Sequence, residues 1–183
     1  MKILTLATTV ETRTRQLLLV ACFTLLLVIP ATIHQQAVTG PLVNALLLLS
    51  FLLFGRAKAF FFALLPSSMA LAAGLLPLPL SPMLPFIMIS NCLYIATFAH
   101  LFQPSAKVAI KAILFAALVK AAFLLGILTY LISPLLPATL TQEMFFMMSF
   151  AQLWTAVAGG FLALGIYQVM GKYVDRSIFT RRD

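Results

Sequence analysis

The stretch VAIKAILFAALVKAAFLLGILTYLI, residues 108–132, decides the fold class of this chain. Apart from two lysines it is almost entirely apolar, and at 1.5 Å per residue a helix of this length crosses a hydrocarbon core of about 30 Å. Neither this stretch nor the runs at 46–49 and 60–65 alternate apolar and polar residues, as the strands of a membrane barrel would. The stretch therefore predicts a transmembrane helix.

Five other segments are similar in length and composition. They cover residues 17–33, 37–54, 59–76, 83–102 and 144–170. Over all 183 residues, 63% are apolar and 9% are charged, whereas a soluble domain is about half apolar and about a quarter charged. This composition excludes a water-soluble enzyme or a soluble binding module. We expect an all-α, polytopic membrane protein with six transmembrane helices.

The basic residues predict the orientation of these helices, because cytoplasmic loops are enriched in Lys and Arg. All of the 12 basic residues except Lys120 fall in the two tails or at alternate connections. They are Lys2, Arg13, Arg15, Arg56, Lys58, Lys107, Lys111, Lys172, Arg176, Arg181 and Arg182. This places both termini in the cytoplasm. The net charge of +8 is then a topology signal that also attracts anionic lipid headgroups, and we expect no nucleic-acid partner.

The chain is predicted to form a single membrane domain. Residues 1–15 form a cytoplasmic N-terminal tail, residues 16–170 a six-helix bundle, and residues 171–183 a basic cytoplasmic C-terminal tail. Basic residues before an apolar run also resemble a signal peptide. No small-x-small cleavage site follows closely, so the first run is interpreted as a span that ends near Pro30.

The residues needed for catalysis or for a metal site are absent from the predicted spans. The four acidic residues lie outside their centres, at Glu11, Glu143, Asp175 and Asp183, so there is no carboxylate pair for acid–base work. There is no HExxH or CxxC motif, and the two histidines lie far apart in the sequence. We expect no enzymatic activity, no metal, no cofactor and no ATP hydrolysis by this chain alone.

Lys120 stands at the centre of the stretch 108–132, with about 18 Å of helix on either side. Its side chain cannot reach the membrane surface from there, and a lysine at a helix centre costs about 2.5–3.5 kcal/mol even on the lenient insertion scale. We therefore expect it to face the bundle interior. It is either neutral because desolvation disfavours the charged form, or paired with an anionic ligand, or hydrogen-bonded structurally to backbone carbonyls or water.

Other polar and aromatic residues are predicted to lie in the same, outer half of the bilayer. Asn91 and Tyr94 share one helix face, and Trp154 lies too deep for the interfacial aromatic belt. The predicted substrate-binding residues are Lys120, Asn91, Tyr94, Gln152, Trp154, Asn44, Tyr130 and His34. Together they outline a polar pocket that opens outward.

Three stretches resemble one family of membrane proteins. They are TGPLVNALLLLSFLL at 39–53, LPLPLSPMLPFIMISNCLYI at 76–95 and FAQLWTAVAGGFLA at 150–163. These stretches look like the substrate-binding S component of energy-coupling factor transporters. The first span lacks the AxxxA pattern common in that family, since Leu17, Ala21 and Leu25 occupy this spacing.

The resemblance implies a binder of a vitamin or similar micronutrient in the bacterial cytoplasmic membrane. Such a subunit captures a small, in one interpretation anionic, substrate from outside. It then works with a coupling membrane subunit and ATPase subunits. The alternative is a structural scaffold subunit of a cell-envelope complex, similar to the rod-shape membrane protein MreD, which needs no ligand.

The positions of the basic residues give a testable topology. A reporter fused after Asp183 should be active in the cytoplasm, and a cysteine introduced at Pro79 should be labelled by a membrane-impermeant reagent from outside. Labelling of position 79 only after the membrane is opened would contradict this topology.

Overall fold

In the computed structural model, residues 2–135 and 144–173 are described, and the described part is helical with no strand. In chain order the α-helices are α1 (Lys2–Thr32), α2 (Gln36–Phe54), α3 (Arg56–Ala63), α4 (Leu65–Ala72), α5 (Leu84–Leu101), α6 (Ala106–Ile127) and α8 (Phe150–Tyr173). Short η1 (Leu78–Met83) precedes α5, and η2 (Leu128–Ile132) and η3 (Ser133–Leu135) follow α6. The prediction of an all-α polytopic membrane protein is confirmed.

Five helical stretches in the described part are long and apolar enough to cross a membrane. They are Arg13–Thr32, Gln36–Phe54, Leu80–Leu101, Ala106–Ile132 and Met144–Gly171. These correspond to five of the six predicted spans. Most of the predicted C-terminal tail, and most of the loop before the last span, lie outside the described residues.

The third predicted span, 59–76, is not one long helix. The chain forms α3 and α4, two helices of 8 residues each, separated at Leu64. Pro66, in the first turn of α4, has no N–H and cannot continue the hydrogen-bond ladder of α3. The interval between α2 and α3 is the single residue Gly55, whose φ of 86° favours glycine.

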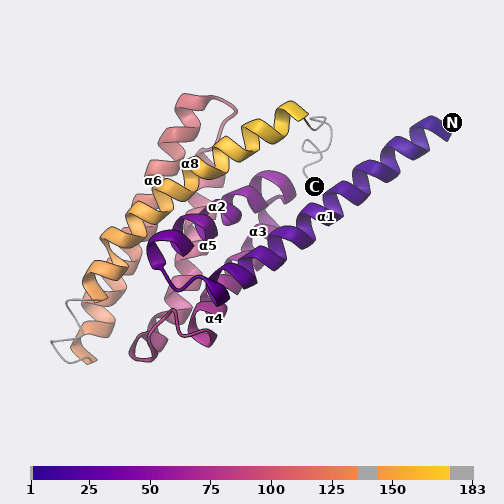
Figure 1. Ribbon diagram of the computed structural model, residues 1–183. Coiled ribbons are helices and arrows are strands. Elements are labelled where there is room, and N and C mark those ends of the chain that lie inside the picture. The colour runs from indigo at the N-terminus through magenta and orange to yellow at the C-terminus, as the bar shows by residue number, and fades with distance from the viewer. Residues whose placement is uncertain (1, 136–143, 174–183) are drawn as a thin grey trace.

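α1 begins inside the predicted N-terminal tail and runs without interruption into the first span. It packs mainly against α2 and α4, and Phe23 also contacts Phe62 of α3; Cys22 and Leu26 are buried. Figure 1 shows the N-terminal part of α1 reaching beyond the other helices. The tail and the first span are therefore one continuous helix.

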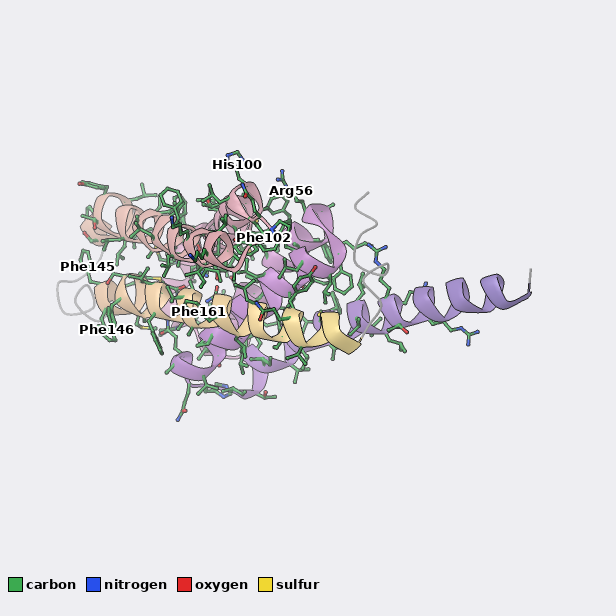
Figure 2. All side chains as sticks on the ribbon, turned by 90° about the horizontal axis from the view of Figure 1, so that it is seen from above. Arg56, His100, Phe102, Phe145, Phe146 and Phe161 are labelled. Carbon is green, nitrogen blue, oxygen red and sulfur yellow. The ribbon has the colours of Figure 1, made fainter. Side chains whose placement is uncertain are left out.

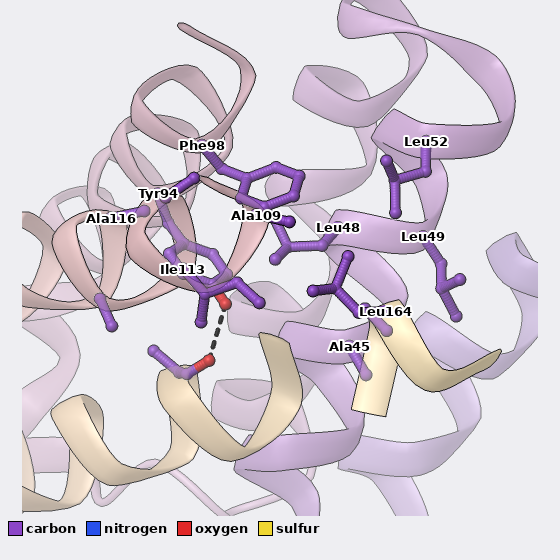
Figure 3. Close-up of a cluster of buried hydrophobic side chains, with 14 residues drawn as sticks. Ala45, Leu48, Leu49, Leu52, Tyr94, Phe98, Ala109, Ile113, Ala116 and Leu164 are labelled. Carbon is purple, nitrogen blue, oxygen red and sulfur yellow. Dashed lines mark hydrogen bonds between the residues drawn. The ribbon is translucent and has the colours of Figure 1, made fainter. Parts of the chain in front are cut away.

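α2 lies at the centre of the bundle, with its closest packing against α8, while α5 packs along α6. Leu48 of α2, Phe98 of α5 and Ile113 of α6 meet in one buried cluster (Figure 3). In the same cluster the buried hydroxyl of Tyr94 donates a hydrogen bond of 2.7 Å to the backbone carbonyl of Ala156 on α8. The core thus ties α2, α5, α6 and α8 into one unit.

The close approach of α2 and α8 depends on a glycine. A Cβ added at Gly159 would lie 2.6 Å from the Cβ of Asn44 and 2.6 Å from the backbone carbonyl oxygen of Pro41. Such small residues let helix backbones come together in a membrane bundle. Gly159 therefore fixes the position of Asn44 relative to α8.

Large apolar side chains cover the outside of the bundle. Phe115 and Leu118 of α6 are about half exposed, as are Phe146 and Phe161 on the last span, and Figure 2 shows Phe146 at the outer edge of the molecule. In water such a surface would aggregate. In a membrane it contacts lipid, in agreement with the composition.

Replacing Gly159 by alanine should lower the free energy of unfolding by about 1–3 kcal/mol, because the methyl group has no room against the backbone of α2. Gly165→Ala, on the same helix in open space, is the matched control and should leave stability equal or higher by about 0.5–1 kcal/mol. Thermal unfolding of both variants in one detergent measures the difference. If Gly159→Ala has the same melting temperature as Gly165→Ala, the packing of α8 against α2 at Gly159 is not tight.

Candidate functional site

Lys120 is buried inside the bundle, as its position in the sequence predicts. It lies in α6 and is 3% exposed. The small residues Ala116 and Ala121 are buried beside it on the same helix. The small neighbours leave room for a long side chain to extend toward α2 and α5. The amine thus ends in the interior and does not reach the membrane surface.

Two asparagine side chains accept hydrogen bonds from the amine of Lys120. Nζ donates hydrogen bonds to Oδ1 of Asn44 on α2, at 2.7 Å, and to Oδ1 of Asn91 on α5, at 2.8 Å. The ring of Tyr94 lies 5.5 Å from Nζ, within the range of a cation–π contact. Neither hydrogen-bond partner is acidic, so the described contacts provide no counter-charge for an ammonium.

The other end of each asparagine amide is also bonded. Nδ2 of Asn44 donates to the carbonyl oxygen of Gly40, at 2.9 Å, and to Oγ1 of Thr155 on α8, at 3.5 Å. This fixes the amide of Asn44 with its carbonyl oxygen toward the lysine.

Asn91 is oriented in the same way from α5. Its Nδ2 donates to the carbonyl oxygen of Ala63, at 3.2 Å, and to Oγ of Ser67, at 3.4 Å. These acceptors stand on either side of the break between α3 and α4. We call Lys120, Asn44, Asn91, Ser67 and Thr155 the Lys120 network; all five are buried, and the network joins α2, α4, α5, α6 and α8.

The Lys120 network borders a cavity of about 110 Å³, several times the roughly 10–15 Å³ that one water needs. The cavity lies between α2, α4, α5, α6 and the last span. Its lining comprises Pro30, Gln36, Thr39, Gly40, Val43, Asn44, Pro66, Ser67, Ala70, Leu75, Leu76, Ile87, Asn91, Lys120, Met147, Met148, Gln152 and Thr155. The five residues from α2 follow the spacing of one helix face.

The structure brings four of the predicted site residues to this cavity: Lys120, Asn44, Asn91 and Gln152. Tyr94 lies next to Lys120 but does not line the cavity. His34 lies outside it, in the connection between α1 and α2, where its Nε2 is 3.1 Å from the carbonyl oxygen of Ala73. In the tautomer with a proton on Nε2, this hydrogen bond ties the connection to the end of α4.

Trp154 and Tyr130 are not brought to the cavity. Trp154 is 55% exposed and Tyr130 is 85% exposed, both on the outside of the bundle. Trp154 is two positions after Gln152, which is about 200° around a helix, so the two side chains cannot share a face. Tyr130 lies in η2, a wider helical turn beyond the end of α6. The α-helical spacing from Lys120 therefore does not predict which way Tyr130 faces.

Sequence reasoning missed Ser67 and Thr39 as lining residues. Ser67 and Ser68 are adjacent in an apolar segment, but only Ser67 is buried while Ser68 is exposed. A predicted break at Leu64 would have started a new helix near Pro66. The position of each serine around that helix could then have indicated which one faces the interior. Thr39 donates to the carbonyl oxygen of Ile33 at 2.6 Å and so caps the connection above the cavity.

The site offers hydrogen bonding rather than metal ligation. Among the described residues, no three His, Cys, Asp or Glu side chains are grouped so that they could hold a metal ion. The cavity's polar side chains are instead an amine, amides and hydroxyls, and most of its other lining residues are apolar. Such a combination is typical of a binding pocket for a small molecule.

The five long apolar helices of the described part define this chain as a multi-pass membrane protein. A scan against protein-family models, a search of curated proteins and a search of solved structures each returned no match to the chain.

Replacing Lys120 by methionine should destabilise the protein. The change leaves two buried amide oxygens without a donor, at about 1–3 kcal/mol each, although it also removes an amine that is costly to bury. Lys111→Met, at an exposed position of the same helix, is the matched control and should change the melting temperature little. Equal melting temperatures for the two variants would show that the asparagines do not depend on the lysine.

Proposed function

We propose that this chain is the substrate-binding S component of an energy-coupling factor transporter and captures a small molecule in the cavity beside Lys120. The observation that carries the proposal is the cavity of about 110 Å³ bordered by a buried, amide-held amine. A purely structural polar network would need no adjoining cavity. Binding pockets, in contrast, combine apolar walls with a few placed polar groups.

The position of the cavity along the helices supports capture from outside. Its lining includes Gln36, at the start of α2, and Leu75 and Leu76, which follow α4. Both connections lack basic residues and are therefore predicted to face the outside. A ligand would enter near these connections and reach the Lys120 network below them.

The proposal assigns energy supply to partner subunits. The chain has no phosphate-binding loop and no carboxylate pair, so it is proposed to be a binding protein and not an enzyme. In this account a coupling membrane subunit and ATPase subunits complete the transporter in the bacterial cytoplasmic membrane. The basic connections and tails, with Lys58 and Lys107 exposed, would lie on the side where those ATPases dock.

The second candidate is a scaffold subunit of a cell-envelope complex. One observation favours it: the protein itself supplies two hydrogen-bond acceptors to Lys120, so the amine is not left without partners when no ligand is bound. In that case the Lys120 network serves to hold α2, α5 and α6 in register. The cavity would then contain only water or lipid.

Mass spectrometry of small molecules released from the purified protein separates the two candidates. The transporter subunit should release one compound in a fixed ratio to protein. Ala70→Phe, which fills the cavity from α4, should abolish this release, whereas Ala72→Phe, exposed on the same helix, should retain it. Release of no specific compound from the wild-type protein, with normal folding, would contradict the transporter proposal and favour the scaffold.

A further inference from the structure

We call the part of the cavity lined by Lys120, Asn44, Asn91 and Ser67 its floor. The floor contains hydrogen-bond donors. A protonated lysine has three N–H groups, and the hydrogen bonds to Asn44 and Asn91 use two of them. The third has no hydrogen-bond partner among the described residues. Because Lys120 lines the cavity, this N–H is available to a bound molecule.

Each hydrogen-bond acceptor beside the amine of Lys120 already accepts one hydrogen bond. Both asparagine carbonyl oxygens accept from Lys120, and both Nδ2 groups point away from it toward other partners. Ser67 Oγ accepts from Asn91, and its own proton has no acceptor in the described part of the chain. A ligand group beside Lys120 therefore meets an amine and a hydroxyl that can both donate, and an accepting group on the ligand would pair with both.

The rest of the cavity is long and mostly apolar. Along α2 it extends from Gln36 to Asn44, and eight residues of helix correspond to about 12 Å. Val43, Ile87 and Met148 contribute apolar side chains between these ends. The walls thus fit an apolar body attached to the group that meets the floor.

From this arrangement we infer that the ligand is an amphipathic organic monoanion, with a carboxylate at Lys120 and an apolar body along α2. The inference rests on the proposed function. The lining contains one basic and no acidic side chain, which matches a single negative charge and opposes a cation. A carboxylate accepts charge-assisted hydrogen bonds, which are stronger than those to a neutral acceptor.

Three unbranched probes of six carbon atoms each test the head group. Hexanoate, hexanamide and hexylamine are titrated against the full-length protein in nanodiscs of zwitterionic lipid, with binding followed by ligand-observed NMR and empty nanodiscs as the blank. Hexanoate should bind at least tenfold more tightly than hexanamide, and hexylamine should not bind above the blank. Equal or tighter binding of hexanamide or hexylamine would overturn the inference.

Two single substitutions test whether the preference for hexanoate arises at Lys120. Asn44→Asp keeps the side-chain shape, gives the lysine a built-in carboxylate and leaves no amine unpaired. It should reduce hexanoate binding at least tenfold. Gln103→Glu adds the same charge at an exposed position between α5 and α6, outside the cavity and away from its proposed entrance, and should leave hexanoate binding unchanged. Retained hexanoate binding in folded Asn44→Asp protein would also overturn the inference.

The result is distinguishable from failure of the proposed function. If no probe binds while the purified protein still releases a specific compound, the ligand class is wrong and the binding function stands. If no probe binds and no compound is released, both the ligand class and the transporter proposal are wrong.

Discussion

The amine of Lys120 must find hydrogen-bond acceptors inside the helix bundle, away from the membrane surface. Leaving such a group unpaired in an apolar interior is costly, and the bundle meets this constraint with amide oxygens from two other helices. Each amide is in turn fixed by its own donors, so the groups form one connected network. Networks of this kind are specific because any displaced member leaves several groups unpaired.

The packing of the helices follows from that requirement. Small residues on α6 leave space for the lysine side chain, and Gly159 lets α8 approach the segment of α2 that carries Asn44. The break between α3 and α4 places the carbonyl of Ala63 and the hydroxyl of Ser67 where Asn91 can donate to them. The Pro66 that divides the third predicted span thereby also contributes to the site.

The sequence predicted the fold well and the site in part. Apolar length is a strong signal and located five spans, and the depth of Lys120 in its helix correctly predicted that its side chain faces the interior. The third span is divided where Pro66 begins a new helix, and apolar length alone does not distinguish such a break from one continuous helix. The hydrogen bonds from Lys120 to Asn44 and Asn91 depend on how α2, α5 and α6 are rotated about their axes. Trp154 was expected in the pocket because it lies deep in the membrane. Its position around α8 instead places it on the outside of the bundle.

The coupling between Lys120 and Asn44 tests the central claim most directly. The free energies of unfolding of Lys120→Met, Asn44→Leu and the double variant, measured in one detergent, form a double-mutant cycle. If the network organises the bundle, the double variant should be more stable than the sum of the two single effects predicts, by about 0.5–3 kcal/mol. Strictly additive effects would contradict the claim, because they would show that the lysine and the asparagine stabilise the protein independently.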